Sequence, residues 1–316
     1  MVKNNTFLNL LFTKYISAVV FCVLLAFNLL FTRNFVSWTT FANIITQTSS
    51  VMFLALGMTL VIATGGIDIS VGSAMGLAAT ISAIFLAMGH PEGTLISLLA
   101  LCLLGLLTGI LVAKFSILPM VVTLAMQYIM RGLAKGVSGR GTIAYNLPGL
   151  TNFFINPLIG PVPAHFFVLI IAVFVMYILV NRMKFGSYVE FYGNNPLAAR
   201  ICGINTTRIV LFCYMISAIF AWFGGMIDMF MVSSADPSKI GLDLETDAIA
   251  ATLIGGTPIT GGYPNIIGSV FGAFLLQLIT MMCNMHNIPY SYSMMLKAGI
   301  IIFALFFHGL RNKNFR

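Results

Sequence analysis

Most candidate functional residues lie in three polar interruptions of an otherwise apolar chain. The first is GGIDISVGS, residues 65–73. A carboxylate between two long apolar segments is costly unless it is hydrated or paired. Asp68 or Ser70 could cap the helix that follows, and contact with a passing solute is the alternative; we expect capping. The small residues favour close helix packing. The candidate residues here are Gly65, Gly66, Asp68, Ser70, Gly72 and Ser73.

The second interruption is GNNPLAARICGI, residues 193–204. Asn195 can act as an N-cap, Pro196 suits the first helical position, and Gly203 can end the helix. This pattern predicts an amphipathic helix of about two turns, which is marginal alone and needs a surface to pack on. We expect docking on a partner protein, with the membrane surface as the alternative. The candidate docking residues are Asn194, Asn195, Pro196, Ala198, Ala199, Arg200 and Gly203.

The third interruption, ATLIGGTPITGGYPNIIGSVFG at 251–272, resembles VIATGGIDISVGSAMG at 61–76. Each has an apolar stretch, a Gly-Gly break, a polar turn, and Gly-Ser at the start of another small-residue segment. The similarity predicts a parallel internal repeat whose glycine-interrupted segments line or shape a pathway. Chance similarity between glycine-rich breaks is the alternative. The candidate residues are Gly255, Gly256, Gly261 and Gly262.

Isolated polar residues inside apolar segments are weaker candidates. Asp228 could belong to a proton relay, but it has no evident His or Lys partner, so we expect an interhelical hydrogen bond or contact with water. Most single polar residues of this kind form interhelical hydrogen bonds. The weak candidates for contact with a hydrophilic solute are Asn43, Gln47, Thr123 and Gln127.

No catalytic or metal-binding motif is present in the sequence. The string nearest to a phosphate-binding loop, GVSGRGT at 136–142, has Arg where Lys is required. Neither H-E-x-x-H nor G-x-S-x-G occurs, and the five cysteines and four histidines have no ligand spacing. We therefore expect a chain that is not an enzyme, binds no metal or cofactor, and depends on another chain for any ATP and Mg²⁺ chemistry.

The composition predicts that these residues are held by apolar helices in a bilayer. Hydrophobic residues make up 59% of the 316 positions, charged residues 8%, and the mean hydropathy is +1.00. Soluble domains carry about 25% charge. Apolar runs such as 95–113 do not alternate, which favours helices over a barrel. The net charge of +8 is spread between the apolar runs and forms no nucleic-acid-binding patch.

The hydropathy pattern predicts an all-α membrane protein with about ten transmembrane helices in a single domain, residues 1–316. A span needs about 20 apolar residues. The predicted segments are 15–32, 42–63, 70–88, 94–113, 117–133, 165–181, 209–231, 242–256, 264–283 and 294–308. The eighth and tenth are short.

Charge predicts the orientation of these segments. With the amino terminus inside, ten Lys and Arg residues fall on the inner side and six, including Arg131 and Lys297, on the outer side. Both termini are then cytoplasmic, with a periplasmic loop at about 134–164 and a cytoplasmic loop at about 182–208. Lys3 and Lys14 precede an apolar run without a cleavage site, so the run is predicted to be a first membrane helix.

Three strings together resemble the permease subunit of ribose/galactose-type bacterial ATP-binding-cassette sugar importers. They are GMTLVIATGGIDISVGS (57–73), the FG…GNNPLAARICGIN loop (185–205) and LETDAIAATLIGGTPITGGYPNIIGSVFGA (244–273). Their order and spacing match across nearly the whole chain. Two departures are Tyr263-Pro264, where relatives usually have a further Gly, and Asn195-Pro196, where acidic or small residues are common.

The resemblance implies a ten-helix permease of the bacterial inner membrane that works as a homo- or heterodimer. It implies two cytoplasmic ATPase chains as partners and a periplasmic sugar-binding protein that delivers the solute. The helix at Pro196–Gly203 would be the coupling helix, and the glycine-rich hairpins would line the pathway. The expected function is import of a monosaccharide of the ribose, galactose, xylose or galactofuranose class. Import of another small polar solute, such as a nucleoside or an autoinducer, is the alternative. An ion-coupled secondary transporter would need paired ionisable groups in the membrane, and the sequence shows none.

Overall fold

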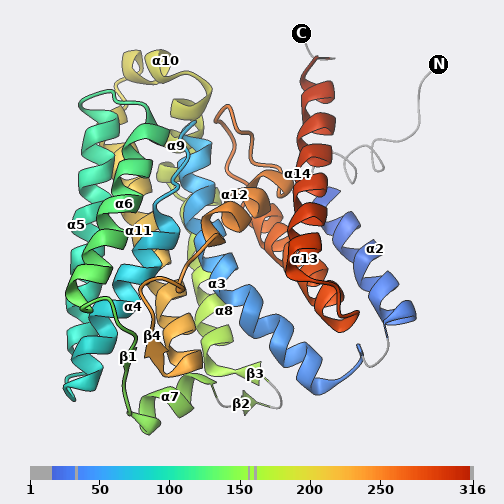
Figure 1. Cartoon of the computed structure of the whole chain (residues 1–316). Helices are drawn as coiled ribbons and strands as arrows, with labels where there is room; N and C mark the ends of the chain where they lie inside the picture. Colours follow the sequence, from blue (N-terminus) through green and yellow to red (C-terminus); the bar gives the residue numbers. More distant parts are fainter. Residues whose placement is uncertain (1–15, 33–34, 156, 160–161, 314–316) are drawn as a thin grey trace.

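The fold is a bundle of helices with four very short strands at one end (Figure 1). The computed structural model describes residues 16–32, 35–155, 157–159 and 162–313. The helices are α2 (Ile16–Phe31), α3 (Trp38–Ala63), α4 (Val71–Ala87), α5 (Gly93–Ala113), α6 (Pro119–Val137), α7 (Pro148–Ile155), α8 (Ala164–Asn181), α9 (Lys184–Asn194), α10 (Pro196–Ile201), α11 (Thr206–Val232), α12 (Leu244–Ile254), α13 (Ile266–Met285) and α14 (Tyr290–Lys313). The strands are β1 (Ile143–Ala144), β2 (Pro157–Ile159), β3 (Val162–Pro163) and β4 (Ser234–Ala235).

Each of the ten predicted segments overlaps one helix. Five of the described helices are long and apolar enough to cross a membrane, namely α3, α5, α8, α11 and α13. By contrast α12 has 11 residues, about 16 Å at 1.5 Å per residue, or roughly half of the hydrocarbon thickness. The eighth segment is therefore half a span, and the count of ten spans stays a prediction. Lys3, Lys14, Arg33 and Arg316, which enter the charge count, lie outside the described residues.

The two central helices are α3 and α11, and most of the others pack around them. Small residues set their close approach. A Cβ atom added to Gly57 of α3 would lie 2.8 Å from the Cα of Ser217 in α11, and one added to Gly109 of α5 would lie 2.8 Å from the Cα of Leu211. Apolar helices in lipid gain little from burying more apolar surface, so close backbone packing replaces it as the main attraction.

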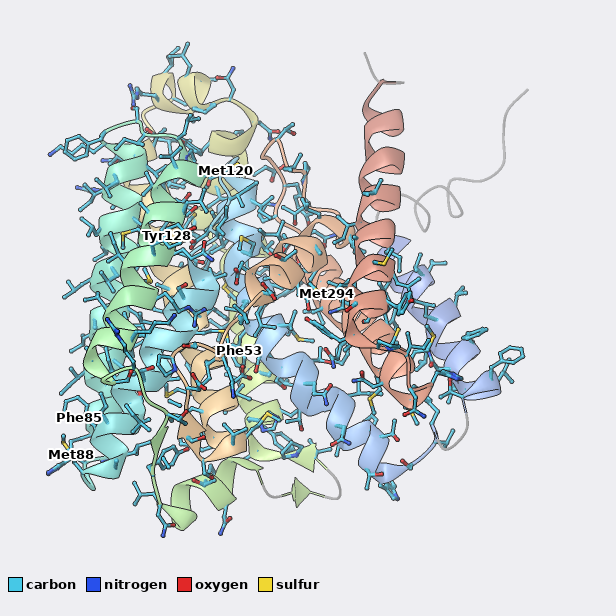
Figure 2. All side chains as sticks on the ribbon, viewed as in Figure 1. Phe53, Phe85, Met88, Met120, Tyr128 and Met294 are labelled. Carbon is cyan, nitrogen blue, oxygen red and sulfur yellow. The ribbon has the colours of Figure 1, made fainter. Side chains whose placement is uncertain are left out.

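Large apolar side chains face outward from the bundle. Met120 and Tyr128 of α6 are 49% and 76% exposed, and Met294 of α14 is 45% exposed (Figure 2). Patches of this size would be a liability in water. They suit a surface covered by lipid or by another subunit.

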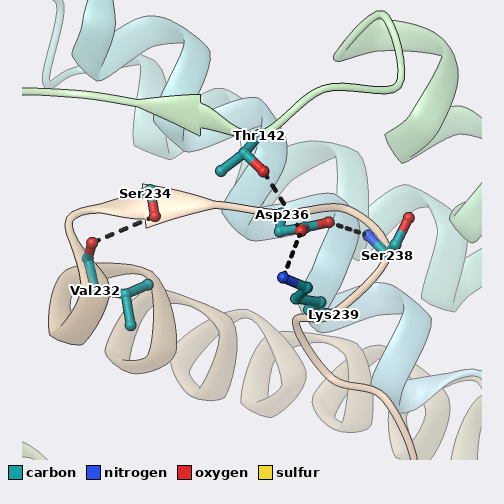
Figure 3. Close-up of polar contacts among 6 residues, drawn as sticks. All are labelled: Thr142, Val232, Ser234, Asp236, Ser238 and Lys239. Carbon is teal, nitrogen blue, oxygen red and sulfur yellow. Dashed lines mark hydrogen bonds and ion pairs between the residues drawn. The ribbon is translucent and has the colours of Figure 1, made fainter.

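The end of the bundle opposite α10 is closed by the predicted 134–164 loop, which contains α7 and three of the strands (Figure 1). There β1 pairs antiparallel with β4, and Asp236 follows at once (Figure 3). The carboxylate of Asp236 accepts hydrogen bonds from the Ser238 amide at 2.9 Å and the Thr142 hydroxyl at 3.4 Å, and the ammonium of Lys239 is 3.6 Å away. The Ser238 amide, followed by the charge of Lys239, lowers the pKa of Asp236.

The predicted 182–208 loop contains two helices, α9 and α10. The sequence pattern indicates only the second, because Gly, Ser and aromatic residues make Lys184–Asn194 a weak helix former. Tertiary contact compensates: Val189 is fully buried, and a Cβ on Gly186 would overlap the carbonyl oxygen of Val180 at the end of α8.

Candidate functional site

The three polar interruptions meet at one point, beside α10. The amide of Gly262 donates to the carbonyl oxygen of Ala63 at 2.8 Å. A Cβ on Gly193 would overlap that same oxygen and the Gly262 nitrogen, and one on Gly261 would lie 2.8 Å from the Gly193 oxygen and 3.1 Å from the Gly65 nitrogen. We call Gly65, Gly193, Gly261 and Gly262 the glycine junction.

Glycine is required at the junction for two different reasons. Gly65, Gly261 and Gly262 have φ angles of +78°, +89° and +121°, a region that other residues rarely adopt. Gly193 lies at the end of α9, with no such φ. There the reason is space, since main chains from both glycine-rich breaks occupy the position of a side chain.

The short helix α10 has the predicted cap. The side-chain oxygen of Asn195 accepts hydrogen bonds from the amides of Leu197 and Ala198, both at 3.0 Å, and Pro196 is the first helical residue. Gly203, with φ +79°, follows the end of the helix. The prediction of a capped helix at this place is confirmed, because N-caps depend on residues only two or three positions apart.

One side of α10 is anchored and the other presents an apolar surface. Ala199 is 3% exposed, whereas Leu197 and Ile201, one turn apart, are 68% and 78% exposed, and Phe191 at the end of α9 is 60% exposed. A helix end outside the spans gains nothing by exposing such side chains to water, so this surface fits contact with another protein.

The glycine junction is connected to α10 by a very short stretch of chain. Only Asn194 and Asn195 separate Gly193 from the start of α10, and the Asn194 side-chain oxygen lies 3.0 Å from the position of a Cβ on Gly262. A displacement of α10 would therefore press directly on the main chain of both breaks. Glycine leaves no side chain whose rotation could absorb that displacement.

A cavity of about 470 Å³ lies between α10, the glycine junction and the connection from α5 to α6. Its polar lining includes Thr64, Tyr192, Arg200 and Thr206. Burial raises the pKa of Tyr192 in α9. The cavity borders Pro196, Leu197 and Arg200 of α10 and leaves space beside this helix.

Asp68 holds the first break together. One carboxylate oxygen accepts from the Ser70 amide at 3.0 Å and the Ser70 hydroxyl at 2.6 Å, and the other accepts from the Ser217 hydroxyl of α11 at 3.1 Å. Ser70 occupies the N-cap position of α4 but makes no capping bond itself. Asp68 thus serves the helix start as expected, and it also ties that start to α11.

The small-residue face of α4 packs as predicted. A Cβ on Gly72 would overlap a carboxylate oxygen of Glu245 and the carbonyl oxygen of Gly241, and one on Gly76 would lie 2.6 Å from the Arg131 guanidinium. The backbone of α4 therefore packs against α12 and against the charged side chains beside α12.

The second break is closed by Asn265. Its amide nitrogen donates to the Gly255 carbonyl at 2.7 Å, and its oxygen accepts from the Gly268 amide at 3.0 Å. Gly256, with φ +92°, turns the chain between these contacts. In both breaks a polar side chain therefore bonds to the main chain at the start of the next helix.

Buried charges surround the N-terminus of α12, and the sequence pattern did not reveal their partners. Gln127 of α6 donates to one oxygen of Glu245 at 3.2 Å. The other oxygen has no hydrogen-bond partner among the described residues. Arg131 donates to the carbonyl oxygens of Ile240 and Pro237 at 2.7 and 2.9 Å.

An ion pair joins α12 to α14. The Lys297 ammonium lies 2.7 Å from the Asp247 carboxylate, and Lys297 is 7% exposed. The sequence pattern did not indicate this pair, because partners 50 positions apart give no local pattern. Arg131 and Lys297 lie within α6 and α14, and the orientation stays a prediction.

The weak solute-contact candidates are engaged by the protein, apart from Asn43, which is exposed. Thr123 donates to the Ile67 carbonyl at 3.0 Å, and Gln47 accepts from Gln277 at 2.5 Å. Gln127 bonds to Glu245. Asp228 accepts from the Ser50 hydroxyl of α3, which confirms the expected interhelical hydrogen bond. A solute role for these four candidates stays a prediction.

Among the described residues no three His, Cys, Asp or Glu side chains are close enough to hold a metal ion. The five cysteines are free thiols. Cys213 and Cys283 are buried, whereas Cys22 and Cys202 are exposed, the latter at the end of α10.

Comparison with known proteins gives consistent matches. Residues 40–305 match the family described as branched-chain amino acid transport system / permease component. The chain is 34% identical over 265 residues to the galactofuranose transporter permease protein YtfT of Escherichia coli (strain K12), covering 83% of this chain and 77% of that protein. No solved structure matches significantly.

Two further relatives extend the match to almost the full length. The ribose import permease protein RbsC of Escherichia coli (strain K12) is 31% identical over 297 residues, which is 92% of this chain and 91% of that protein. The galactose/methyl galactoside import permease protein MglC of the same strain is 30% identical over 320 residues, with 93% of each covered.

Proposed function

Because the chain belongs to the branched-chain amino acid transport system / permease component family, we propose that it is the membrane-spanning permease of an ATP-driven importer of a monosaccharide. The names of the three relatives given above include galactofuranose, ribose and galactose. This supports a sugar as the solute. The single observation that carries the mechanism is the contact of both glycine-rich breaks with Gly193, two residues from α10.

In the proposed mechanism, α10 is the coupling helix. Its exposed Leu197 and Ile201 dock on a partner ATPase, whose closure on ATP and Mg²⁺ displaces α10. Gly193 passes the displacement to the main chain beside Ala63 and Gly262. The α3–α4 and α12–α13 hairpins then shift together, which switches the pathway between outward-facing and inward-facing states.

The rest of the proposal concerns placement and partners. The α10 end faces the cytoplasm of a bacterium, both termini lie there, and the 134–164 loop faces the periplasm. The ten helical segments form one permease domain with a parallel repeat in which α3–α4 corresponds to α12–α13. A second permease, two ATPase chains and a periplasmic sugar-binding protein complete the assembly in the inner membrane.

Introducing a charge into the apolar surface of α10 tests the docking role. Leu197→Glu and Ile201→Glu are expected to abolish co-purification of the ATPase and ATP-driven sugar uptake, while membrane insertion stays normal because both side chains are exposed. Phe153→Glu, at an exposed position of α7 on the opposite end, is the matched control and should retain the ATPase. Retention of the ATPase by both α10 variants, with normal uptake, would contradict the docking role.

Two further measurements separate the proposal from its rivals. Cys202 is exposed at the end of α10, so a membrane-impermeant maleimide should label it in inside-out vesicles and not in intact cells; the reverse pattern would overturn the orientation. Permease reconstituted without ATPase should take up no ribose, galactose or galactofuranose under an ion gradient. Gradient-driven uptake would instead indicate an ion-coupled secondary transporter.

A further inference from the structure

The cavity of about 470 Å³ beside α10 is lined by hydrogen-bond donors and by one positive charge. Its walls come from the ends of α3 and α5, the connection from α5 to α6, and the helices α9, α10 and α11 (Figure 1). Arg200 is the one charged side chain among the described residues of this lining, which include no Asp or Glu. A lining of this kind attracts an anion.

The start of α11 supplies free backbone donors to this cavity. The Asn205 side chain accepts from the Arg208 amide at 3.1 Å. The amides of Thr206 and Thr207, the first two residues of α11, have no hydrogen-bond partner among the described residues. Both residues line the cavity. Free amides and the aligned peptide dipoles of a 27-residue helix favour a negative charge at this place.

The Thr206 side chain gives an independent indication of a ligand. Buried threonines inside helices, such as Thr59 and Thr80, donate to the carbonyl oxygen four positions earlier. Thr206 has no preceding helical turn, and its hydroxyl bonds to no described residue. Thr206 is only 7% exposed, yet this hydroxyl is not one of the unpartnered atoms sealed inside the protein. It therefore opens onto the cavity that Thr206 lines, and a ligand that accepts from it would remove the cost of an unpaired hydroxyl.

Tyr192 and Arg200 complete the set of donors. The Tyr192 hydroxyl makes no hydrogen bond to a described residue. Burial raises the pKa of Tyr192, and the charge of Arg200 opposes this rise only in part. The hydroxyl therefore stays protonated and can donate. Arg200 is exposed and makes no ion pair with a described residue, so its guanidinium is free to bind an oxyanion.

We infer that this cavity is a binding site for a phosphate group. The amides of Thr206 and Thr207 and the hydroxyls of Thr206 and Tyr192 donate to the phosphate oxygens, and Arg200 neutralises their charge. The volume lies within the range of pockets that enclose small ligands and leaves room for the organic group that carries the phosphate. A neutral monosaccharide would leave the charge of Arg200 uncompensated, so the site is separate from the proposed transport of the solute.

Two sources of phosphate can reach this cavity. The helix α5 is long and apolar enough to cross a membrane, and Leu103, Leu107 and Ile110 are exposed on it. The cavity begins beside Val112 and Ala113 at the end of this helix, where phospholipid headgroups lie in a bilayer. An anionic phospholipid would place its chains against α5 and its phosphate in the cavity. A soluble phosphate compound would use the same donors.

Thermal unfolding of the purified permease in detergent tests the inference, because a ligand of the folded chain raises the unfolding temperature. The probes, at constant ionic strength, are didecanoyl phosphatidylglycerol, the diacylglycerol with the same chains, and inorganic phosphate. We expect a saturable rise with phosphatidylglycerol, with an apparent affinity at least fivefold tighter than that of diacylglycerol. A saturable rise with inorganic phosphate at equal affinity would support the site and assign it to a soluble phosphate. No saturable rise with either phosphate compound would overturn the inference, as would equal rises with the two lipids and none with inorganic phosphate.

Variants assign the effect to the cavity. Arg200→Gln should weaken binding of the phosphate compound at least fivefold and Thr206→Val about threefold. Arg208→Gln, an exposed position outside the lining, is the matched control and should weaken binding less than twofold. Ser116→Asp adds a negative charge at an exposed lining position with φ +53°, which Asp tolerates. It should abolish binding, whereas Ser116→Asn should retain it, and this pair serves if Thr206→Val does not fold. Equal weakening by Arg200→Gln and Arg208→Gln would show general attraction to positive charge and overturn the inference.

Discussion

The two ends of the molecule are packed in opposite ways. At the glycine junction, main chains from three distant segments touch, and a Cβ atom on Gly193 would overlap the Ala63 oxygen and the Gly262 nitrogen. At the other end, aromatic side chains enclose about 390 Å³ of open space. Contact between main chains transmits a displacement directly, whereas a side-chain cavity can change shape by rotation about χ angles. The difference fits a coupling role at the end beside α10.

Gly193→Ala should have the largest effect, since it places an atom on the Ala63 oxygen and the Gly262 nitrogen. We expect a loss of about 3 kcal/mol of stability or more and at least a tenfold loss of ATP-driven uptake. Thermal unfolding in detergent and vesicle uptake measure the two. Gly132→Ala in α6, where an added Cβ meets nothing within 4 Å, is the control and should be neutral or slightly stabilising. Equal behaviour of the two variants would show that the junction tolerates side chains.

Asn265→Ala should cost about 2–3 kcal/mol, because it leaves the Gly255 carbonyl and the Gly268 amide buried and unpaired. Thermal unfolding measures the cost. Asn205→Ala removes a similar bond to the Arg208 amide at the exposed start of α11 and should cost about 1 kcal/mol. If both variants lost the same stability, burial at the second break would contribute nothing special.

A matched pair of valine substitutions contrasts the two ends directly. Val189→Phe, at a fully buried position of α9 beside the junction, should destabilise by about 1–3 kcal/mol through overpacking. Val168→Phe, at the wall of the aromatic cavity, should change the unfolding free energy by less than about 1 kcal/mol, in the stabilising direction, because the space is already present. A Val168→Phe variant as unstable as Val189→Phe would mean that the cavity is not open.

Asp236→Asn should give the smallest effect and a characteristic pH dependence. The folded-state pKa of Asp236 is lowered by the Ser238 amide and then by Lys239, so its charge stabilises the fold above the unfolded pKa of about 4. That contribution is lost as the pH falls through the folded pKa. At pH 7 the variant should be less stable by no more than about 0.5 kcal/mol, since ion pairs near the surface contribute little, and the difference should vanish once the pH is below the folded-state pKa of Asp236. A difference that grew on acidification would contradict the sign of the shift.

Local features of the fold could be predicted from the sequence. The apolar runs coincide with helices because about 20 apolar residues in lipid have no alternative to internal hydrogen bonding. The cap of α10 was predictable because Asn195 bonds to amides two and three positions away. The packing of Gly72 followed from the small size of neighbouring residues, although its partner Glu245 did not.

Long-range features could not be predicted in the same way. The sequence marked the three interruptions separately, and nothing local indicates that Gly193 touches both of the others. The helix α9 was missed because burial of Val189 and Gly186, rather than propensity, stabilises it. The pairing of Lys297 with Asp247 was missed because the sequence around a charged residue does not indicate which distant residue it will contact.

Local patterns in the amino-acid sequence indicated that the chain lies in a membrane, that its ten apolar segments form helices, and at which breaks these segments end. Only the folded structure showed that the breaks share one backbone contact beside α10 and that aromatic rings at the other end surround a cavity. The physical reason is range. Hydropathy and capping depend on residues within a few positions, whereas close packing and cavities depend on which surfaces meet after the chain has folded.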